Sequence, residues 1–396
     1  MLYLCRKPTN FYRKMKKIIL LSLALLLTAG LSAQSNDGKW KPVGNRKIRV
    51  VHWGICHAHS RGKWNAVKNL NDDFELLGWV DDTDSKAVRM SEPKKEKYAG
   101  YPIFTPEQVF NEIKPDLIVV ETANDDLVGV ATQVAKHGTA MHMDKPLGTS
   151  AKGFARISKI CSENNIPIQI GYMFRTNDAL IKMVEIAKSG IIGEVYSVEA
   201  DMDHSYGKSN YPKYVSHFPG GIAYDLTCHL IDWVMPIFDD ALPKRTWSVT
   251  KPAPGDEEWA KTHTLTVMEY PRANVVMRAC SEGTIWRRHI RIDGSRGTIE
   301  MAPIEAYSKV NRKTGVRELK TMEVRVYLKN VNEAAKAAGY KKGLNSFVYP
   351  ALIDRYEGQF KELARIIRGE TSYPKGLYEH DLRVHKVSLD AVYNIR

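Results

Sequence analysis

The sequence predicts a two-domain protein, in which an α/β domain with a doubly wound parallel sheet precedes an α+β domain with a mostly antiparallel, open sheet. Three observations support this prediction. Strand-like and helix-like segments alternate from residue 48 to residue 170. From about residue 172, strand-like segments follow one another with almost no helix between them. The chain has 396 residues, which is long enough for two hydrophobic cores.

The first part of the chain is expected to consist of repeated strand–helix units. Apolar segments of strand length alternate with segments in which apolar residues recur every three to four positions. Such alternation is typical of a parallel sheet with right-handed crossovers, whose ligands bind beyond the carboxyl ends of the strands. The expected strands are 48–53, 74–80, 117–120, 140–143 and 166–170, and the expected helices are 64–70, 85–90, 106–113, 127–137 and 152–164.

The succession of strands and helices is different in the second part of the chain. A helix over 178–189 is expected to end at Gly190, and the strand-like segments after it are not separated by helices. This succession predicts one mostly antiparallel sheet, followed by two amphipathic helices. The expected strands are 194–203, 246–250, 262–269, 273–279, 289–293 and 297–301, and the two helices are 350–368 and 381–393. We therefore divide the chain into a domain over 46–171 and a domain over 172–396.

The amino terminus has the three parts of a secretory signal. Three lysines within residues 14–17 precede an apolar run over 18–27, which is too short to span a bilayer comfortably. Small residues then lead to Ala33, as at a cleavage site. We expect residues 1–33 to be removed and 34–45 to form a polar linker, so that the protein is periplasmic or secreted and not held in a membrane. An uncleaved anchor is the alternative.

The charge of the chain argues against nucleic acid as a partner. The chain carries 58 basic and 45 acidic residues, but six of the basic ones fall in the signal, so 52 remain and the net charge is +7. These basic residues are dispersed, whereas a nucleic-acid-binding protein needs a continuous basic stripe and a recognition motif.

Four cysteines remain after the signal, namely Cys56, Cys161, Cys228 and Cys280. Their spacing matches neither a zinc site nor a dense disulfide framework. We therefore expect buried free thiols, while one or two disulfides remain possible in an oxidising compartment.

A strand, a tight turn and a helix are expected around Gly54, which is the context that a dinucleotide-binding loop requires. The turn over 54–59 reads Gly-Ile-Cys-His-Ala-His, so only the first glycine of the G-x-G-x-x-G pattern is present. Cys56 stands where a second glycine would let the backbone approach a pyrophosphate. The turn is either a modified dinucleotide loop, with Ile55 and His57 also near the cofactor, or an ordinary connection between a strand and a helix.

Carboxylates at the end of the second strand favour NAD as the cofactor. Asp81 lies 27 residues after Gly54, where a carboxylate can bind both hydroxyls of the adenosine ribose and would repel the 2′-phosphate of NADP. The adjacent Asp82 could take this role instead. Thr122 and Asn124 follow a third predicted strand, so they are expected in the same crevice at the carboxyl ends of the strands.

Lys145 is the first candidate for catalysis. It follows a predicted strand and precedes Pro146, and the residue before a proline is held in an extended conformation. This geometry would direct the side chain into the crevice, where a desolvated lysine can act as an acid, a base or a donor that orients a hydroxyl group. A solvated surface lysine is the alternative.

A second group of chemically active residues follows the glycine pair at 220–221. Asp225 and His229 are four residues apart, so on a helix they share one face, and Asp232 lies on the same side. A histidine beside a carboxylate suits proton transfer near neutral pH. Two alternatives remain, a helix cap beside a core histidine or a metal site. We expect no metal, because a fourth ligand is not evident and Lys145 would repel a cation.

Five segments, in the expected order, resemble the glucose–fructose oxidoreductase, inositol dehydrogenase and rhizopine-catabolism family. Asp144-Lys145-Pro146 resembles that family's Glu-Lys-Pro motif, with aspartate in place of glutamate. The glycine pair at 220–221, Asp225 and His229 resemble its pattern of Gly-Gly, Asp, three residues and His. The other three segments are 171–175, 189–195 and 294–298. The resemblance extends over about residues 46 to 393.

The resemblance implies an amino-terminal Rossmann domain and a carboxyl-terminal sheet domain that often mediates oligomers, so we expect a homo-oligomer. It also implies that Lys145, Asp225 and His229 surround a nicotinamide ring and a hydroxyl of a sugar or cyclitol. In that arrangement His229 takes the hydroxyl proton and Lys145 polarises the same oxygen. The expected cofactor-binding residues are Gly54, Ile55, Cys56, His57, Asp81, Asp82, Thr122, Asn124, Lys145 and Arg175.

The expected function is that of an exported, NAD-dependent oxidoreductase acting on a hydroxyl of a sugar, sugar derivative or cyclitol. Free NAD is scarce outside the cytoplasm, so we expect a tightly bound cofactor, with either hydride exchange between two substrates or a redox-neutral elimination, epimerisation or glycoside cleavage. The alternative is a non-catalytic carbohydrate-binding relative that has lost the cofactor, as the altered glycine loop suggests. The segment from Tyr206 to Phe218 is expected to shape the substrate pocket or to lie at a subunit contact.

Overall fold

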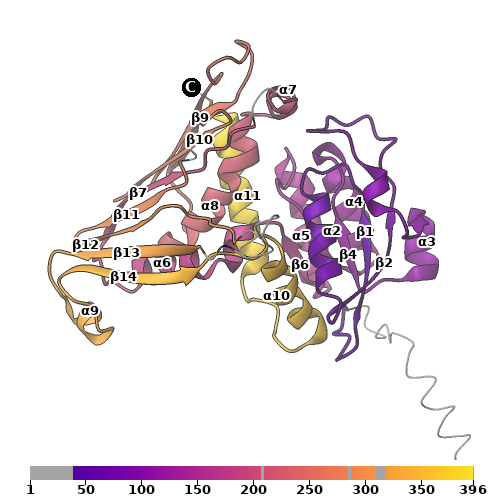
Figure 1. Ribbon diagram of the computed structural model, residues 1–396, viewed down its shortest axis with the longest axis horizontal. Helices are drawn as coiled ribbons and strands as arrows, with labels where there is room; N and C mark the ends of the chain where they lie inside the picture. Colours follow the sequence, from indigo (N-terminus) through magenta and orange to yellow (C-terminus); the bar gives the residue numbers. More distant parts are fainter. Residues whose placement is uncertain (1–38, 207–208, 284–286, 309–317, 319, 396) are drawn as a thin grey trace, which may run out of the picture.

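The computed structural model describes residues 39–395 apart from 207–208, 284–286, 309–317 and 319. The predicted signal and the first part of the predicted linker lie outside the described residues. Two sheets organise the described chain, and helices lie between them (Figure 1). In the described part, no helix has the length and apolar character needed to cross a membrane.

The first sheet has six parallel strands in the order β3-β2-β1-β4-β5-β6, which confirms the predicted doubly wound fold. The order reverses between β1 and β4, so the carboxyl ends of these strands flank the place where ligands bind in such folds. The strands are β1 (Ile48–Trp53), β2 (Phe74–Val80), β3 (Ile103–Phe104), β4 (Leu117–Val120), β5 (Ala140–Met143) and β6 (Ile168–Ile170).

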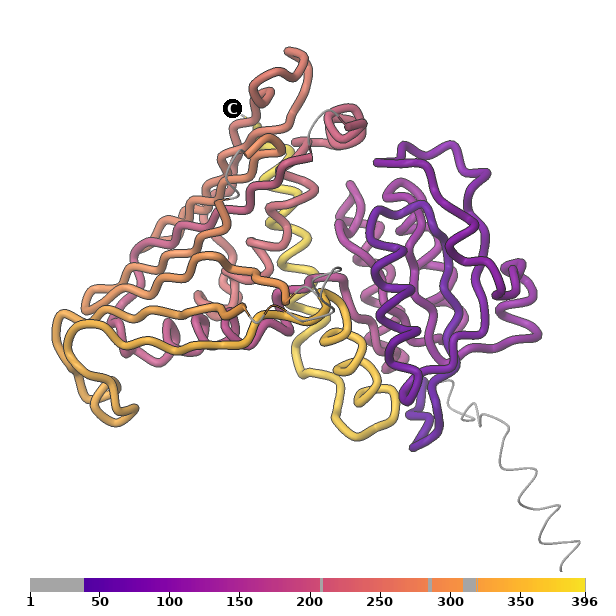
Figure 2. Tube along the Cα trace, in the orientation of Figure 1, coloured from indigo at the N-terminus to yellow at the C-terminus, as the bar shows by residue number. Residues whose placement is uncertain are grey.

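Helices cover both faces of this sheet, because its central strands are apolar on both sides. Alternate residues of β1 and β4 pack with α4 (Asn124–Lys136) and α5 (Ala151–Glu163). The remaining residues of these strands pack with α2 (Ser60–Asn69) and α10 (Glu357–Arg368). Figure 2 shows α10, near the yellow end of the chain, beside the indigo first domain. The predicted second domain therefore supplies part of the cover of the first sheet.

The helices near the start of the chain differ from the prediction in position. The helix predicted over 64–70 begins at Ser60, so the turn after β1 is short and the helix starts directly after the candidate loop. The helix predicted over 106–113 is present as α3 (Pro106–Gln108), which a π-helical turn, η2 (Val109–Ile113), continues.

The helix predicted over 85–90 is absent, and this prediction was wrong. The chain forms turns there, and a 3-10 turn, η1 (Lys95–Tyr98), follows. The guanidinium of Arg89 donates to the carbonyl oxygens of Thr83 and Ser85. In a helix the Ser85 carbonyl would accept a hydrogen bond from a backbone N–H. Here the Arg89 side chain donates to that carbonyl instead.

The second sheet has eight strands in the order β14-β13-β12-β11-β7-β10-β9-β8. Only β7 and β10 pair in parallel among its described strands, which confirms the predicted mostly antiparallel sheet. The strands β13 and β14 were not predicted, and the predicted helix over 350–368 begins later because residue 350 belongs to β14. The strands are β7 (Val195–Asp201), β8 (Arg245–Lys251), β9 (His263–Glu269), β10 (Asn274–Cys280), β11 (Ile290–Gly294), β12 (Gly297–Met301), β13 (Thr321–Leu328) and β14 (Gly343–Pro350).

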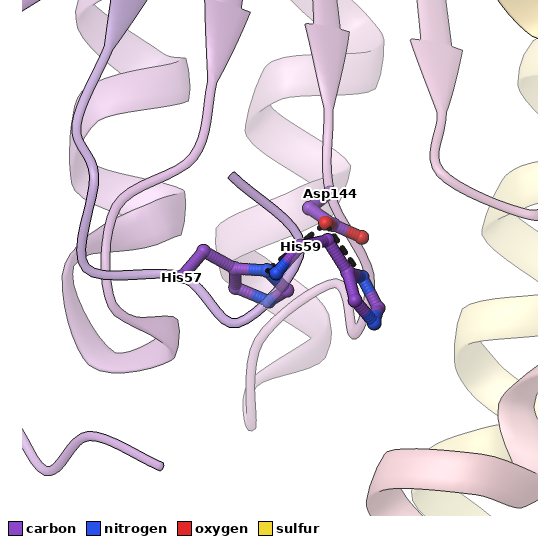
Figure 3. A group of neighbouring side chains, drawn as sticks. All are labelled: His57, His59 and Asp144. Atoms are coloured by element: carbon purple, nitrogen blue, oxygen red, sulfur yellow. Dashed lines mark hydrogen bonds and ion pairs between the residues drawn. The ribbon is translucent and has the colours of Figure 1, made fainter. Parts of the chain in front are cut away.

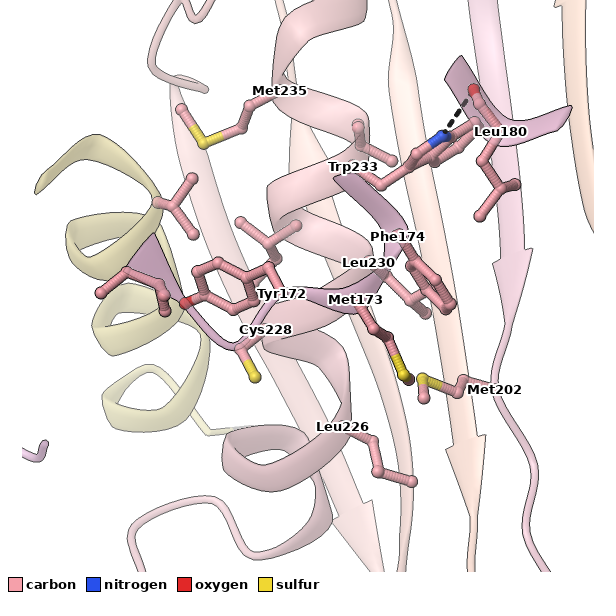
Figure 4. Packing of buried hydrophobic residues seen from close by; sticks show 14 of the residues in the cluster. Tyr172, Met173, Phe174, Leu180, Met202, Leu226, Cys228, Leu230, Trp233 and Met235 are labelled. Atoms are coloured by element: carbon pink, nitrogen blue, oxygen red, sulfur yellow. Dashed lines mark hydrogen bonds between the residues drawn. The ribbon is translucent and has the colours of Figure 1, made fainter. Parts of the chain in front are cut away.

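One continuous group of buried side chains joins the two domains. The group includes Ile170 of β6 in the first domain together with Leu230 and Trp233 of the second. Tyr172 and Phe174, at the start of the second domain, lie beside α8, which carries Leu230 and Trp233 (Figure 4). This packing fixes the elements that carry the candidate site relative to each other. The helical elements of the second domain are η3 (Met173–Thr176), α6 (Asp178–Lys188), α7 (Tyr211–Ser216), η4 (Ala223–Thr227), α8 (Cys228–Val234), η5 (Met235–Phe238), α9 (Glu333–Ala337) and α11 (Leu377–Tyr393).

The end of the predicted linker is docked on the first domain. The backbone N–H of Trp40 donates to the Asn164 carbonyl at 2.9 Å, and the N–H of Val43 donates to the Ile367 carbonyl at 2.9 Å. Both apolar side chains pack against the core around α2 and α10. The part of the predicted linker from Trp40 onward is therefore packed against the first domain.

All four cysteines of the predicted mature chain are free thiols. Cys56, Cys161 and Cys228 are buried, and Cys280 is half-buried. The expectation of free thiols is confirmed, with Cys280 less buried than expected.

Candidate active site

Lys145 and Asp225 form a buried ion pair between the two domains. Lys145 lies just after β5, and Asp225 lies in the π-helical turn η4 that leads into α8. The Nζ atom of Lys145 donates to the Oδ1 atom of Asp225 at 2.8 Å and to the backbone carbonyl of Asp225 at 2.9 Å. Charges in such a buried site are little screened by water, so the pair can act strongly on a reacting group beside it.

Both members of this pair are charged at neutral pH. Burial tends to raise the pKa of Asp225, but Lys145 and a hydrogen bond from Tyr211 hold it below its usual value. Burial tends to lower the pKa of Lys145, but Asp225 raises it above the usual value. The Tyr211 hydroxyl donates to Asp225 Oδ2 at 2.8 Å, and its ring stacks on Tyr206 with 4.0 Å between ring centroids. The segment predicted to shape the pocket therefore contacts the ion pair.

His229 lies on α8, four residues after Asp225, and is buried. Its ring lies near Tyr172 and Phe174, with centroid distances of 5.9 and 5.7 Å. Its Nδ1 atom has no hydrogen-bond partner among the described residues. Burial and the charge of Lys145 hold the pKa of His229 well below its usual value, so the imidazole is neutral and can accept a proton. The structure thus brings all three predicted catalytic residues together.

Gly54 opens the candidate cofactor loop in a conformation that favours glycine. Its φ is +91°, and a Cβ atom at this position would come within 2.7 Å of the Thr122 side chain. The loop amide of Ile55 donates to Asp82 Oδ1 at 2.7 Å, and the thiol of Cys56 donates to the Asp82 carbonyl at 3.4 Å. The Asp82 carboxylate therefore holds the loop in place and is itself buried.

Asp81 is the carboxylate of this pair that a ribose could reach. Its side chain is about a quarter exposed and contacts Thr83 and Lys95. Burial tends to raise the pKa of Asp81, but Lys95 and Thr83 lower it. The ammonium of Lys95 is half exposed, so it remains free to bind a ligand anion as well.

Two buried side chains after β4 have unused hydrogen-bonding capacity. Thr122 Oγ1 and Asn124 Oδ1 have no partner in the described part of the chain, whereas Asn124 Nδ2 donates to the Tyr214 hydroxyl at 2.9 Å. Buried polar atoms are normally paired, so these two acceptors suit a polar ligand at the carboxyl edge of the sheet. They lie where the sequence predicted cofactor contacts.

A cluster of charged side chains lies beneath the loop and was not predicted as a unit. Its members are His57, His59, Lys63, Glu121 and Asp144, and we call it the histidine–carboxylate cluster. Lys63 Nζ lies 2.8 Å from Glu121 Oε1 and 2.7 Å from Asp144 Oδ2. The Nδ1 atoms of His57 and His59 lie 3.0 and 2.9 Å from the same Asp144 oxygen. Figure 3 shows the two imidazole rings on either side of that carboxylate.

The two histidines of the cluster differ in charge. Burial tends to lower the pKa of His57, but Asp144 and Glu121 raise it to about 9, so His57 is protonated at neutral pH. Burial, together with the charges of Lys145 and His57, lowers the pKa of His59 to about 4 in spite of Asp144, so His59 is neutral. Lys63 and His57 both lie against the two buried carboxyl groups, Glu121 and Asp144.

The sequence offered only partial signals for this cluster. The two histidines stand in the loop itself, and Asp144 belongs to the motif around Lys145. Lys63 and Glu121 have no such signal, because a lysine on a helix and a glutamate after a strand are ordinarily exposed. Here both are completely buried, which only the packing of α2 on β4 and β5 reveals.

Arg175, a predicted cofactor-binding residue, is engaged elsewhere. Its guanidinium binds Asp232 at 2.5 Å and Asp381 at 2.5 Å, and His380 also contacts Asp232 at 3.1 Å. These residues lie beside a cavity of about 410 Å³ between α6 and the start of α11, which none of the three predicted catalytic residues lines. The structure therefore does not bring the Arg175 guanidinium to the strand ends.

Polar side chains of the second domain, which were not predicted from the sequence, extend from the ion pair. His204 stacks on Tyr206 with 4.7 Å between centroids, and Arg288 Nη2 lies 2.8 Å from His204 Nε2. Farther on, Arg355 Nε donates to the Tyr307 hydroxyl at 2.8 Å. These residues come from separate connecting segments, so no local spacing could group them. They supply donors of the kind that bind sugar hydroxyls.

The fold and this site define a two-domain protein with a Rossmann-type sheet, whose strand ends carry a Lys–Asp–His group shared with the second domain. Residues 180–300 match the model of the GFO/IDH/MocA C-terminal domain. The resemblance to the glucose–fructose oxidoreductase, inositol dehydrogenase and rhizopine-catabolism family is thereby confirmed, and residues 180–300 are similar to the C-terminal domain of that family.

Two relatives of similar sequence are named as oxidoreductases. The oxidoreductase YdgJ of Escherichia coli (strain K12) is 24% identical over 218 residues, which cover 54% of this chain and 62% of the relative. The oxidoreductase YteT of Bacillus subtilis (strain 168) is 24% identical over 192 residues, which cover 46% of this chain and 44% of the relative. The similarity thus spans less than two thirds of either relative.

Solved structures share the fold over most of the chain. KijD10, a 3-ketoreductase from Actinomadura kijaniata solved with NADP and TDP-benzene, has a TM-score of 0.68 at 14% identity, with 89% of this chain and 98% of that chain covered. An NADPH-dependent oxidoreductase from Desulfitobacterium hafniense has a TM-score of 0.65 at 19% identity, with 88% and 96% covered. At such identities the likeness establishes the fold.

Proposed function

We propose that the protein is an exported oxidoreductase that acts, with a nicotinamide dinucleotide, on a hydroxyl of a sugar, sugar derivative or cyclitol. The observation that carries this proposal is the buried Lys145–Asp225 ion pair beside the neutral, unpartnered imidazole of His229. The group lies at the carboxyl edge of a Rossmann-type sheet, where nicotinamide cofactors bind in such folds.

The side chains at this edge fit the cofactor. Gly54 holds the turn after β1 close to Thr122, and the unused acceptors Thr122 Oγ1 and Asn124 Oδ1 point to a polar ligand. Asp81 is accessible at the end of β2, which favours NAD through its ribose hydroxyls, although NADP occurs in one protein of the same fold. The Lys95 ammonium beside Asp81 weakens the repulsion of a 2′-phosphate, so we propose a preference for NAD, and not an exclusion of NADP.

Each residue of the site has a separate role in the proposed reaction. The bound cofactor would accept a hydride from the carbon that carries the reacting hydroxyl. The neutral imidazole of His229 takes the hydroxyl proton, and the Lys145 ammonium donates a hydrogen bond to the same oxygen. Asp225 orients Lys145 and keeps it charged, and Tyr211 holds the other oxygen of that carboxylate. Such positioned acid–base groups contribute about 10²- to 10⁴-fold each in enzymes.

The predicted export signal bears on the net reaction. A protein outside the cytoplasm cannot draw on a pool of free cofactor, so we propose that the dinucleotide stays bound through many turnovers. Hydride would then pass between two substrates, or return to the same molecule after an elimination, epimerisation or glycoside cleavage. In the second case transient oxidation of a hydroxyl acidifies the neighbouring C–H bond, and the overall reaction is redox-neutral.

Release of small molecules tests this proposal directly. The purified full-length protein is denatured, and the released compounds are identified by mass spectrometry. We expect NAD or NADH in near-stoichiometric amount, and a rise in the melting temperature of the cofactor-free protein when NAD is added. Absence of both signals would contradict the proposal.

A non-catalytic carbohydrate-binding protein is the second candidate, and one observation favours it. The Ile55 amide and the Cys56 thiol, which lie in the loop expected to approach a pyrophosphate, are engaged by Asp82. A sugar that raised the melting temperature of a protein free of any dinucleotide response would support this candidate instead.

Localisation and assembly are further parts of the proposal. We propose cleavage after Ala33 and a periplasmic or secreted homo-oligomer without membrane attachment. Cell fractionation with amino-terminal sequencing tests the first part, and sedimentation equilibrium of the mature protein tests the second. A full-length protein in the membrane fraction would contradict the cleavage.

A further inference from the structure

His59 differs from every other member of the histidine–carboxylate cluster in its access to solvent. The side chains of Lys63, Glu121 and Asp144 are completely buried and that of His57 is 3% exposed, whereas that of His59 is 25% exposed. Figure 3 shows His59 and His57 on either side of the Asp144 carboxylate. The cluster therefore presents a single imidazole to the outside.

Asp144 fixes the orientation and the tautomer of this imidazole. His59 Nδ1 and Asp144 Oδ2 lie 2.9 Å apart in a hydrogen bond, and a carboxylate can only accept, so Nδ1 carries the proton. The lone pair is then on Nε2, for which no described residue serves as a hydrogen-bond partner. A buried carboxylate that orients a histidine in this way is the arrangement that enzymes use to prepare a general base.

The exposed imidazole faces the second domain near the ion pair. Its ring lies 5.9 Å from that of Tyr356, which stands just before α10. Tyr356 can approach α2 so closely because residue 62 is glycine, where a Cβ would lie 2.3 Å from the tyrosine ring. His59 is also near enough to Lys145 and Asp225 for their charges to affect one another.

We propose that His59, held by Asp144, is a second proton-transfer residue that removes the proton from the carbon next to the oxidised one. This inference rests on the proposed function, because it needs a substrate whose hydroxyl has first become a carbonyl. The His59–Asp144 pair then distinguishes an enzyme built for elimination or epimerisation from a simple dehydrogenase. The substrate class is a sugar or cyclitol with a C–H bond adjacent to the reacting hydroxyl.

The step balances in protons and electrons. A bound dinucleotide would oxidise the hydroxyl to a carbonyl, which acidifies the adjacent C–H bond. His59 Nε2 takes that proton, and the electron pair of the C–H bond forms the carbon–carbon double bond of an enolate, whose oxygen Lys145 stabilises. A proton delivered from solvent to the opposite face gives an epimer. In an elimination the enolate electrons expel a leaving group from the next carbon, and that group takes the proton from His59. The hydride would then be returned to the carbonyl carbon.

The positions of the other cluster members suit this assignment better than a metal site. A cation bound by His57, His59 and Asp144 would lie next to the Lys63 ammonium, which is 2.7 Å from the shared Asp144 oxygen. The positive charges of Lys63 and His57 instead keep Asp144 ionised, because burial alone would raise its pKa while these groups hold it well below the usual value. Asp144 therefore remains an acceptor for His59.

The experiment compares the wild-type protein with His59→Gln. Glutamine can still hydrogen-bond to Asp144 but cannot take a proton. Each protein is loaded with NAD and incubated in D₂O with a panel of methyl pyranosides and inositols. Nicotinamide reduction is followed by absorbance, and deuterium at the carbon next to the oxidised one by mass spectrometry and NMR. We expect deuterium uptake to fall about 100-fold or more in His59→Gln, with nicotinamide reduction within about threefold of wild type.

The matched control is His289→Gln, because His289 also pairs with a carboxylate, Glu300 at 3.0 Å, but lies just before β11 in the second domain. This variant should retain both signals. Unchanged deuterium uptake in His59→Gln, or an equal loss of both signals, overturns the inference while the proposed function stands. Wild-type protein that reduces nicotinamide without deuterium uptake has the same consequence. Failure of the wild type to reduce nicotinamide with any member of the panel overturns the proposed function together with the inference.

A second readout does not depend on turnover. In ¹⁵N-histidine spectra of the cofactor-free protein, the resonances lost in His59→Gln identify His59. We expect the neutral tautomer with a proton on Nδ1 and none on Nε2 at neutral pH. A protonated Nε2 would overturn the inference, because that atom could then not accept a proton.

Discussion

The Lys145 ammonium lies 2.8 Å from the Asp225 carboxylate, although the two residues are 80 positions apart and belong to different domains. Lys145→Met removes the charge that polarises the substrate oxygen, so we expect turnover to fall by about 10²- to 10⁴-fold. The variant also leaves Asp225 buried without its cation, which typically costs about 3–5 kcal/mol of unfolding free energy. Urea denaturation and steady-state kinetics measure the two effects.

The double variant Lys145→Met/Asp225→Asn separates these two effects. It removes both charges, so we expect most of the unfolding free energy to return while turnover stays low. A double variant that remained as unstable as the single one would show that the ion pair is not the origin of the loss. Recovery of turnover would contradict the role assigned to Lys145.

His229→Ala should remove turnover for a different reason. The neutral imidazole is the proposed acceptor of the hydroxyl proton, and no neighbouring carboxylate bonds to its Nδ1 atom in the described structure. We expect a loss of about 10²- to 10⁴-fold in turnover with NAD binding unchanged, measured by isothermal titration and kinetics. Activity near the wild-type level would show that another group takes the proton.

The raised pKa of His57 makes stability depend on pH in the alkaline direction. A group whose folded pKa lies above its unfolded value of about 6.5 stabilises the fold fully below that value, and the contribution is lost as the pH rises to about 9. The charged groups facing His57 are Asp144, Glu121 and Lys63. The pKa of Glu121 is also raised, so its contribution to the free energy of unfolding is likewise lost as the pH rises. This loss begins at a lower pH than that of His57.

The free energy of unfolding should therefore fall between about pH 6.5 and about pH 9. Urea denaturation across this range measures it, with His57→Gln as the comparison. We expect a smaller slope in the variant, because it lacks the titrating group. Equal slopes in the two proteins would show that His57 does not hold a proton in the folded state.

Asp81 should decide between the two nicotinamide dinucleotides. Asp81→Asn removes the carboxylate that would bind the ribose hydroxyls and leaves Lys95 without its partner. We expect the NAD affinity to fall about tenfold or more and the NADP affinity to rise, since a hydrogen bond to a charged group contributes about 1.5–3 kcal/mol. Asp84→Asn, at a nearby exposed position, is the matched control for isothermal titration. Equal effects of both variants would contradict the assignment.

We expect Arg175 to stabilise the fold and not to bind the cofactor. Arg175→Ala leaves Asp232 and Asp381 without their cation, so we expect the unfolding free energy to fall by about 3–5 kcal/mol while the affinity for NAD stays the same. Arg272→Ala removes an exposed pair with Glu194 and should cost less than about 1 kcal/mol. A marked loss of NAD affinity in Arg175→Ala would instead support the cofactor contact that the sequence predicted.

The elements that the sequence predicted well are those in which local pattern and tertiary packing agree. The strands 117–120, 140–143 and 297–301 have their predicted bounds, because short apolar or alternating runs between turn residues leave little freedom. The helix predicted over 85–90 is absent, and there the Arg89 side chain donates to the Ser85 carbonyl. The alternation of β13 was present in the sequence and was overlooked, whereas β14 is half-exposed and has a weaker signal.

The residues of the candidate site were likewise predicted only where the local sequence carries a signal. Lys145, Asp225 and His229 were found from motif spacing, because a lysine after a strand and two residues at helical spacing leave a local trace. Lys63 and Glu121 were missed, because nothing local distinguishes a buried charge from an exposed one. Arg175 carried a motif signal, yet its nearest partners are Asp232 and Asp381, which are 57 and 206 residues away.

The sequence by itself determined most of the strands and helices, the class of the two domains and the three residues of the central group, since periodicity and spacing depend on local geometry. Only the tertiary structure decided that Lys145 contacts Asp225 and that Asp82 binds the loop while Asp81 stays accessible. It also decided that His59 is the partly exposed member of the histidine–carboxylate cluster. These relationships depend on which distant segments pack together, and on the burial and pKa shifts that result from that packing.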